Sequence, residues 1–428
     1  MKQKQLVVIG GGAAGFFAAV NAARLNPALK VTLLEKSNKL LSKVRISGGG
    51  RCNVTHHCFE IGEMIKNYPR GAHFLKKAFH HFFTTDTIRW FEERGVALKT
   101  ESDGRMFPVT NDSETIIGCL LKEANRYEVD IRMNAEVKEI KFNDELVHGE
   151  GYKRFRICLS GSGFLDADFI CMACGGFPKL SQYNWLQSMA HHIESPIPSL
   201  FTFNMPGNAI TGLMGISVEK TVAKIAGTKL MAEGPLLITH WGMSGPCILR
   251  LSAWGAKELA SNQYHFTLLV NWVPEFSEQE LRKVWPAWRQ LYGANKIHLH
   301  HPFALPARLW QYLLQQSDIA ETQRWSELLT KQQNTLIQLL IAAPFEVKGK
   351  TTFKEEFVTC GGIDVSEIDV NTMQSKKHPG LFFAGEIMNV DGITGGFNFQ
   401  HAWTSGWIAA KAIALMAADA MLSFKRKK

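Results

Sequence analysis

The sequence has no hydrophobic run long enough to cross a membrane. Residues 408–418 form one of its longest apolar stretches, but Lys411 interrupts it, and a spanning helix needs about 20 consecutive apolar residues. The chain also passes from Met1 almost directly into an apolar segment at Leu6, which leaves no room for a signal peptide. We therefore expect a cytoplasmic protein whose eight cysteines are reduced thiols rather than a disulfide framework.

Strong basic charge is missing from the body of the chain. The formal net charge is +9, but six of these charges lie at the two ends, on Lys2, Lys4 and residues 425–428. A short basic end is typical of a solvated terminus, and no motif of a nucleic-acid-binding module accompanies it. We therefore do not expect nucleic-acid binding.

Internal repeats and low-complexity linkers are absent, and no glycine occurs between Asn295 and Phe345. A length of 428 residues predicts two or three domains, at about 150 residues each. An α/β pattern at the start of the chain returns near its end, which predicts one nucleotide-binding domain interrupted by an insert. The predicted boundaries are 1–194 and 346–428 for this domain, 195–274 for a strand-rich part of the insert, and 275–345 for a helical part.

The periodicity of apolar residues predicts the individual elements. They are a βαβ unit over 1–35, an ordered loop over 36–58, helices over 59–94, a helix capped by Ser113, strands at 137–142, 155–159 and 167–173, strands over 199–273, a strand at 381–386 and a helix over 399–421.

The chain begins with the pattern G-x-G-x-x-G at Gly10, Gly12 and Gly15, between an apolar run and a helix-forming segment. A second apolar run then ends in Glu35. The glycines permit a tight turn, close approach of the backbone to a pyrophosphate, and close packing of the helix on the strand. The acid can accept hydrogen bonds from a ribose and would repel a 2′-phosphate. This order predicts a dinucleotide site.

Two further glycine-rich stretches accompany this motif. Residues 43–53 read Lys-Val-Arg-Ile-Ser-Gly-Gly-Gly-Arg-Cys-Asn, a flexible backbone with donors at hand that can lie along an extended cofactor. Residues 383–400 combine a strand end, Glu386, Asp391 and a Thr-Gly-Gly turn that opens a long helix. That helix start offers N–H groups to a polar ligand.

These stretches, with the Thr-His-Trp-Gly-Met-Ser-Gly-Pro segment at 239–246, resemble the BaiN/YhiN/aminoacetone-oxidase-like family of FAD flavoproteins. The resemblance covers essentially the whole chain. It implies an α/β fold: a Rossmann-like FAD-binding domain of the glutathione-reductase type, interrupted by a β-barrel and a small helical subdomain.

The resemblance also implies which residues bind FAD. The ADP half would be held by Gly10, Gly12, Ala13, Ala14, Gly15, Glu35 and Lys36. The pyrophosphate and ring would lie beside Lys43, Ser47, Gly48, Gly49, Arg51, Cys52 and Asn53, and adenine would meet the backbone of Val137. The ribityl chain and isoalloxazine would meet Gly385, Glu386, Asp391, Thr394, Gly395, Gly396 and Asn398. Cys174 and Gly175 belong to a further cofactor segment, where the family's Ala-Thr-Gly-Gly reads Ala-Cys-Gly-Gly.

Two histidines are the candidate catalytic residues. His240 lies in the insert, and its imidazole could orient a substrate or move a proton. The alternative for His240 is a histidine satisfied within the core. His401 stands where the family has Trp, a change that can alter what lies over the flavin ring.

Other cysteines and histidines are interpreted as structural. Cys171 and Cys174 have the spacing of a redox dithiol, but they end an apolar strand, where buried cysteine is common. His298, His300 and His301 lack nearby Cys or carboxylate ligands in a metal-binding spacing. We expect no metal site.

The expected reaction is hydride transfer between the flavin N5 and a small organic substrate held between the ring and the insert. A second G-x-G-x-x-G after a strand is missing, so NADH or NADPH would visit the site transiently. The resemblance suggests an NAD(P)H-linked reductase of C=C bonds, or alternatively an amine oxidase that uses oxygen. A flavin-containing RNA-binding or redox-sensing protein is an outside alternative.

Overall fold

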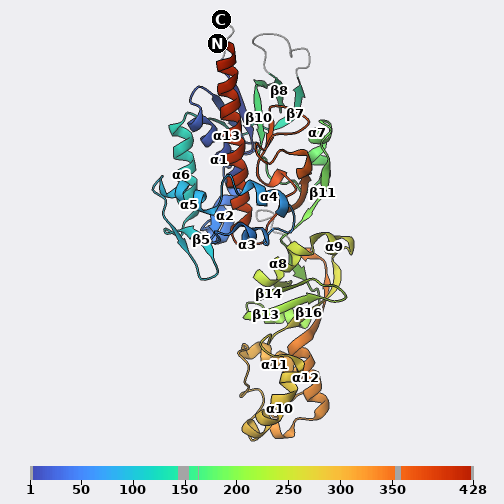
Figure 1. Ribbon diagram of the computed structural model, residues 1–428. Coiled ribbons are helices and arrows are strands. Elements are labelled where there is room, and N and C mark those ends of the chain that lie inside the picture. Colours follow the sequence, from blue (N-terminus) through green and yellow to red (C-terminus); the bar gives the residue numbers. More distant parts are fainter. Residues whose placement is uncertain (1–2, 143–153, 162, 352–357, 426–428) are drawn as a thin grey trace. The chain divides into compact units, whose positions relative to one another are not determined.

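The computed structural model describes residues 3–142, 154–161, 163–351 and 358–425, so Arg426, Lys427 and Lys428 of the basic end lie outside the described residues. The chain forms two compact units, one made of Met1–Pro198 with Lys354–Lys428 and the other of Ser199–Phe353 (Figure 1). Among the helices that are described, none has the length and hydropathy that a membrane crossing requires.

The predicted boundaries at 195 and 346 each fall inside a strand. β11 (Ile193–Pro198) pairs with β19 (Thr359–Ile363), so it belongs to the first unit. β17 (Ala343–Lys348) pairs with β16 (His265–Asn271), so it belongs to the insert. Backbone pairing between strands far apart in the sequence sets these boundaries, and local composition carries no sign of it.

The first unit is built on a five-stranded parallel sheet in the order β20-β10-β1-β2-β6. Its strands are β1 (Gln5–Ile9), β2 (Lys30–Leu34), β6 (Asp130–Arg132), β10 (Phe169–Met172) and β20 (Leu381–Phe383). The central strands are continuous apolar runs because both faces of a parallel sheet are covered. The Rossmann-type α/β fold is thereby confirmed.

Helices α1 (Ala13–Leu25) and α13 (Phe397–Lys425) pack side by side on this sheet (Figure 1). At their contact, a Cβ added to Gly406 would lie 2.9 Å from the carbonyl oxygen of Ala14. The two ends of the chain therefore meet in one helix pair.

The remaining elements surround this centre. They are α2 (Ser42–Gly50), β3 (Thr55–His56), α3 (Ile61–Ile65), α4 (Ala72–Ala78), α5 (Thr84–Glu92), β4 (Leu98–Thr100), β5 (Arg105–Pro108), α6 (Ser113–Arg126), β7 (Val137–Phe142), β8 (Phe155–Leu159), β9 (Phe164–Ala167) and α7 (Asn184–Gln187). The helices over 59–94 and the strands at 137–142 and 155–159 are confirmed.

Two local predictions in this unit are wrong. The expected loop over 36–58 contains α2 and β3, because the residues from Ser42 form a short helical segment before the glycines. The cap of α6 is Asp112, whose carboxylate accepts the N–H of Glu114 at 2.9 Å. Ser113 is the first helical residue instead, and its hydroxyl donates to the carbonyl oxygen of Arg45.

The insert begins with a seven-stranded sheet in the order β17-β16-β13-β14-β15-β12-β18. Its other strands are β12 (Thr202–Asn204), β13 (Ser217–Ile225), β14 (Met231–Thr239), β15 (Gly242–Ser244) and β18 (Lys350–Thr351). All its pairs are antiparallel, and barrel closure stays a prediction.

The expectation of strands alone over 199–273 is wrong, because α8 (Pro246–Trp254) and α9 (Ala256–Ser261) follow β15. Pro246 at the first helical position was the available signal.

The helical part of the insert contains α10 (Glu278–Tyr292), α11 (Ala307–Gln315) and α12 (Thr330–Ala342). Ser277 and Glu280 form a capping box at the start of α10. Trp285, Trp310 and Trp325 are fully buried in this part of the chain. The predicted helical character of 275–345 is confirmed.

Two helical glycines test the packing of α1. A Cβ on Gly15 would lie 1.9 Å from the carbonyl oxygen of Gly10, whereas one on Gly118 in α6 would meet nothing within 4 Å. We expect Gly15→Ala to lower the free energy of unfolding by about 1–3 kcal/mol, because the backbone must move to make room for the methyl group. Gly118→Ala should raise it by about 0.5–1 kcal/mol. Urea unfolding measures both, and equal effects would contradict this packing.

Candidate functional site

The turn between β1 and α1 is shaped for close approach of an anion. Gly10 has φ of +116° and no space for a side chain, since a Cβ would lie 2.3 Å from the carbonyl oxygen of Ala173. At Gly12, by contrast, a Cβ would meet nothing within 4 Å. α1 starts at Ala13 without a side-chain cap or an acidic residue in its first turn. The first N–H groups and the positive end of the helix dipole are therefore available to an anion.

Glu35 is fixed beside this turn. Its Oε2 accepts the N–H of Gly11 at 2.9 Å, and its Oε1 accepts the N–H and hydroxyl of Ser37 at 2.9 and 2.8 Å. A carboxylate can accept further hydrogen bonds, so it can still bind a ribose. The carbonyl oxygen of Glu35 accepts the N–H of Ala135 at 2.9 Å, which brings the start of β7, at Val137, to the same edge. The sequence reasoning missed Gly11.

Lys36 and the Cys174 segment lie at the same edge. The ammonium of Lys36 is 5.6 Å from the ring centre of Phe177, a residue that follows Cys174 and Gly175. Burial raises the thiol pKa of both Cys171 and Cys174 to about 12. Because a redox dithiol needs a thiolate, these values favour the structural interpretation of both cysteines.

The glycines at the end of α2 adopt backbone conformations that disfavour other residues. Gly48 and Gly49 have φ of +60° and +69°, in the left-handed region. A Cβ on Gly48 would lie 2.7 Å from the Phe107 ring, whereas one on Gly49 would meet nothing within 4 Å. Ser47 donates to the carbonyl oxygen of Val44 at 3.0 Å. Burial raises the pKa of the Cys52 thiol to about 12, so this cysteine is not a nucleophile at neutral pH.

An ion pair links the glycine-rich stretch at 383–400 to the one at 43–53. The ammonium of Lys43 lies 2.5 Å from Oε2 of Glu386, whose Oε1 accepts the N–H of Thr359 at 2.9 Å. Gly385 has φ of +72°, and a Cβ there would lie 2.7 Å from Cβ of Ala14. Residues far apart in sequence are thus in contact at the start of α1.

Asn53 and the turn before α13 form a second link. With the Asn53 amide oriented to satisfy its partners, its oxygen accepts the N–H of Gly396 at 2.9 Å and its NH₂ donates to the carbonyl oxygen of Thr55 at 3.0 Å. Gly396 has no space for a side chain, because a Cβ would lie 2.5 Å from the carbonyl oxygen of Thr55. The Asn398 side chain closes the turn by bonding both backbone groups of Gly392 at 2.8 and 2.9 Å. Within this turn, Thr394 and Gly395 are half-buried.

Two predicted charged residues already have partners. Asp391 is fully buried, and both of its carboxylate oxygens accept hydrogen bonds from the guanidinium of Arg70. Arg51 pairs with Glu101 at 2.5 Å. Sequence reasoning missed Arg70 and Glu101, since nothing in their local sequence marks them as partners of residues 321 and 50 positions away.

His401 is buried at the contact of α13 with Gly385. Its Nε2–H donates to the carbonyl oxygen of Gly385 at 3.2 Å, and only 2% of the residue is exposed. Burial lowers the pKa of His401 to about 4, so the imidazole is neutral at pH 7 and does not serve there as a cationic proton donor. Its Nδ1 has no hydrogen-bond partner among the described residues.

His240 lies in the insert, in the turn between β14 and β15. Its side chain is exposed and its ring contacts Trp241 with 4.4 Å between ring centres. The alternative of a satisfied core histidine is therefore wrong. A catalytic role for His240 stays a prediction.

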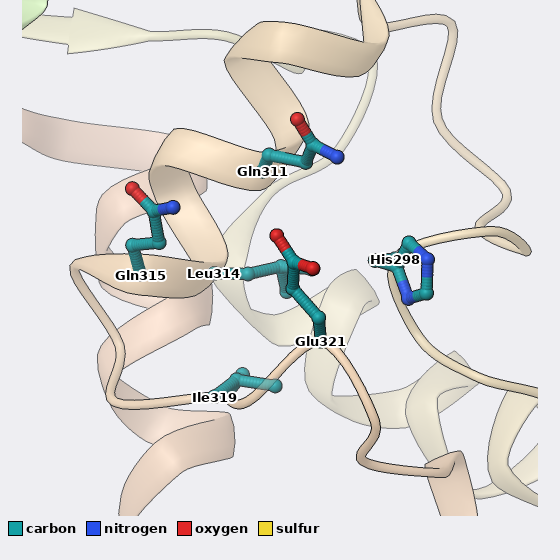
Figure 2. A pocket seen from close by; sticks show the side chains of 6 residues that line it. All are labelled: His298, Gln311, Leu314, Gln315, Ile319 and Glu321. Atoms are coloured by element: carbon teal, nitrogen blue, oxygen red, sulfur yellow. The ribbon is translucent and has the colours of Figure 1, made fainter.

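The helical part of the insert has a small surface pocket. It is lined by His298, Gln311, Leu314, Gln315, Ile319 and Glu321 (Figure 2). None of the predicted cofactor residues lies in it. Within the described part of the chain, no group of three or more His, Cys, Asp or Glu residues could hold a metal ion.

Residues 4–412 match a protein-family model described as the HI0933-like protein Rossmann domain. The chain belongs to this family. The resemblance inferred from the glycine-rich stretches is thereby confirmed.

Relatives of the chain align along nearly their whole length. The 3-dehydro-bile acid delta(4,6)-reductase of Clostridium scindens is 28% identical over 425 residues, which cover 95% of this chain and 98% of that protein. The ribosomal RNA dihydrouridine synthase of Escherichia coli is 30% identical over 422 residues, covering 96% and 98%. A protein of the same description from Haemophilus influenzae is 28% identical over 418 residues, covering 95% and 98%.

Solved structures show the same fold at low identity. The 3-ketosteroid-delta4-(5alpha)-dehydrogenase from Rhodococcus jostii has a TM-score of 0.51 at 12% identity, covering 96% of this chain and 97% of that chain. A flavocytochrome c3 fumarate reductase has a TM-score of 0.50 at 15% identity, covering 97% and 78%.

Gly12 provides a test of the anion site that leaves folding intact. Its φ is −94° and a Cβ there would enter open space, so we expect Gly12→Ala to fold as stably as the wild type. The added methyl would keep an anion from the first N–H groups of α1. We expect at least a ten-fold loss of FAD affinity, about 1.4 kcal/mol, measured by flavin fluorescence titration. Gly118→Ala is the control; unchanged FAD affinity in Gly12→Ala would place the cofactor elsewhere.

The neutral imidazole of His401 makes stability depend on pH. Its pKa is about 4 in the folded protein against an ordinary 6.5, so the unfolded chain binds the proton first as pH falls. The folded state should lose up to about 3 kcal/mol between pH 6.5 and 4, and nothing from this group above pH 6.5. We expect His401→Gln to show a shallower fall in urea-unfolding free energy than the wild type or His240→Gln. Parallel profiles would contradict this prediction.

Proposed function

We propose that this FAD-dependent oxidoreductase saturates a carbon–carbon double bond conjugated to a carbonyl, with NADH or NADPH as electron donor. The observation that carries the proposal is a shared chemistry among relatives that align end to end. One is named as a delta(4,6)-reductase of a 3-dehydro bile acid, and another as a dihydrouridine synthase. Dihydrouridine is uridine with its C5–C6 double bond saturated. Both names therefore describe saturation of a C=C bond that is conjugated to a ring carbonyl.

The residues of the first unit fit FAD as the cofactor. The start of α1 would take the pyrophosphate, and Glu35 would take a ribose. The stretches joined by the Lys43–Glu386 ion pair would lie along the rest of the molecule. The N–H groups at the start of α1 and the Glu35 carboxylate are held by neighbouring residues, so they can orient the cofactor without large side-chain movements. When bound, FAD supplies hydride transfer at N5.

The net reaction balances without a metal or oxygen. The double bond takes up one hydride equivalent and one proton, and NAD(P)H is oxidised to NAD(P)⁺. His401 is neutral and buried, so it positions Gly385 rather than supplying the proton at neutral pH. His240 is exposed and is the candidate for orienting the substrate or delivering the proton.

The alternatives differ in their acceptor or substrate. Amine oxidation by oxygen stays a prediction from the resemblance, because neither reductase-type relative is named as an amine oxidase. Two relatives are named for ribosomal RNA, which supports an RNA substrate. The sequence-based expectation of no nucleic-acid binding is therefore open to direct test.

Flavin spectroscopy under anaerobic conditions tests the proposal. We expect the purified protein to carry a flavin absorbance that NADH or NADPH bleaches without oxygen. The colour should then return on addition of either a 4,6-dien-3-one steroid or a uridine-containing RNA, with the saturated product detected by mass spectrometry. Aminoacetone serves as the control compound. Bleaching by aminoacetone but not by NAD(P)H would replace the reductase by the amine oxidase.

A further inference from the structure

We propose that the helical part of the insert carries an RNA-binding surface formed by Arg289, Lys296 and Arg324, here called the basic edge. The proposal rests on the proposed function, in that it assigns an RNA as the molecule that presents the reducible ring. It locates the surface that would hold the phosphates of that RNA. All three side chains belong to the second compact unit.

The geometry of the backbone brings two of these cations together. Residues 295–297, after α10, run antiparallel to residues 323–325, before α12, and the two segments are here called the ladder. The N–H of Ile297 donates to the carbonyl oxygen of Gln323 at 3.0 Å, and the N–H of Trp325 donates to the carbonyl oxygen of Asn295 at 3.2 Å. Lys296 and Arg324 are direct partners in this bridge. Partners in an antiparallel pair project from the same face. The ammonium and guanidinium groups therefore extend from one side of the ladder.

The third cation is held next to this pair. A guanidinium nitrogen of Arg289 donates to the carbonyl oxygen of Ser326 at 3.0 Å, two residues from Arg324. The ladder itself is anchored by Trp325, which is fully buried and donates its indole N–H to the carbonyl oxygen of His300 at 2.8 Å. The backbone beneath the basic edge is thus held on a packed core, and the Arg289 guanidinium is held by Ser326.

Like charges directly opposite each other destabilise a strand pair, and here no carboxylate neutralises them. Within the described residues, neither Lys296 nor Arg324 forms an ion pair. The nearby acid Glu327 accepts the backbone N–H of Arg324 at 3.0 Å and so caps the turn. Elsewhere on α10, Arg282 does have a partner, Glu278 at 2.8 Å. The two exposed cations are therefore available to an anion at this edge.

A small pocket with polar side chains at its rim lies beside the same two segments as the basic edge. His298 and Glu321 line it from just outside the two ladder segments, and Gln311 and Gln315 line it from α11 (Figure 2). Amide, imidazole and carboxylate groups can hydrogen-bond the edges of unpaired bases. Phosphate contacts beside base contacts are typical of RNA recognition at loops and bulges.

Binding of RNA to the full-length FAD-loaded protein tests the basic edge. The probe is a fluorescein-labelled RNA hairpin whose loop contains only uridines, and binding is followed by fluorescence anisotropy over a range of salt concentrations. The double variant Lys296→Gln/Arg324→Gln should reduce the slope of log K against log salt by about 1.4, because each phosphate that is no longer neutralised accounts for about 0.7. At low salt its affinity should fall roughly ten-fold.

The matched control is Lys224→Gln/Lys229→Gln, which removes two exposed lysines from the sheet part of the insert and should bind RNA like the wild type. Circular dichroism and the thermal midpoint check that both double variants fold. Equal RNA binding by Lys296→Gln/Arg324→Gln and the wild type would overturn the proposal, as would equally tight binding of a duplex DNA of the same length. Bleaching of the flavin by NADPH is measured on the same samples and does not require RNA. Its absence in the wild type would refute the proposed function while leaving the RNA measurement interpretable.

Discussion

The first unit depends on a set of backbone contacts that leave no room for a side chain. Gly15 lies against the carbonyl oxygen of Gly10, Gly10 lies against Ala173, and Gly385 lies against Ala14. These contacts bring the ends of β1, β10 and β20 to the start of α1. Strand ends at one edge of a parallel sheet form the crevice where such folds bind ligands. A side chain at any of these glycines would separate segments that the candidate site needs in contact.

Charge around this crevice is largely compensated within the protein. Lys43 pairs with Glu386, Arg70 with Asp391, and Arg51 with Glu101. The groups that remain for an anion are backbone N–H groups at the start of α1, together with the helix dipole. Such groups are fixed before a ligand arrives, and they do not change with pH. The basic edge is different, because Lys296 and Arg324 form no ion pair among the described residues and their attraction for an anion would weaken with salt.

Much of the fold could be predicted because its signals are local. The spacing of Gly10, Gly12 and Gly15 predicted the turn, and alternation of apolar residues predicted the limits of β7 and β8. Some predictions failed locally, as at the cap Asp112, but the side-chain contacts that could not be predicted depend on distant partners. Nothing near Arg70 shows that it pairs with Asp391, and nothing near Gln400 shows that it accepts hydrogen bonds from Thr55 and Thr87. The candidate cofactor residues were named by motif, but the contacts that hold them come from tertiary structure.

The pairing of β11 with β19 has a consequence for how the family can change. Pro198 is opposite Thr359 in this ladder, so the chain leaves the first unit and re-enters it at neighbouring points. An inserted segment of any size then leaves the parallel sheet undisturbed, as with a loop between two strands of a hairpin. The insert can therefore differ in length and sequence between family members without a change in the parallel sheet.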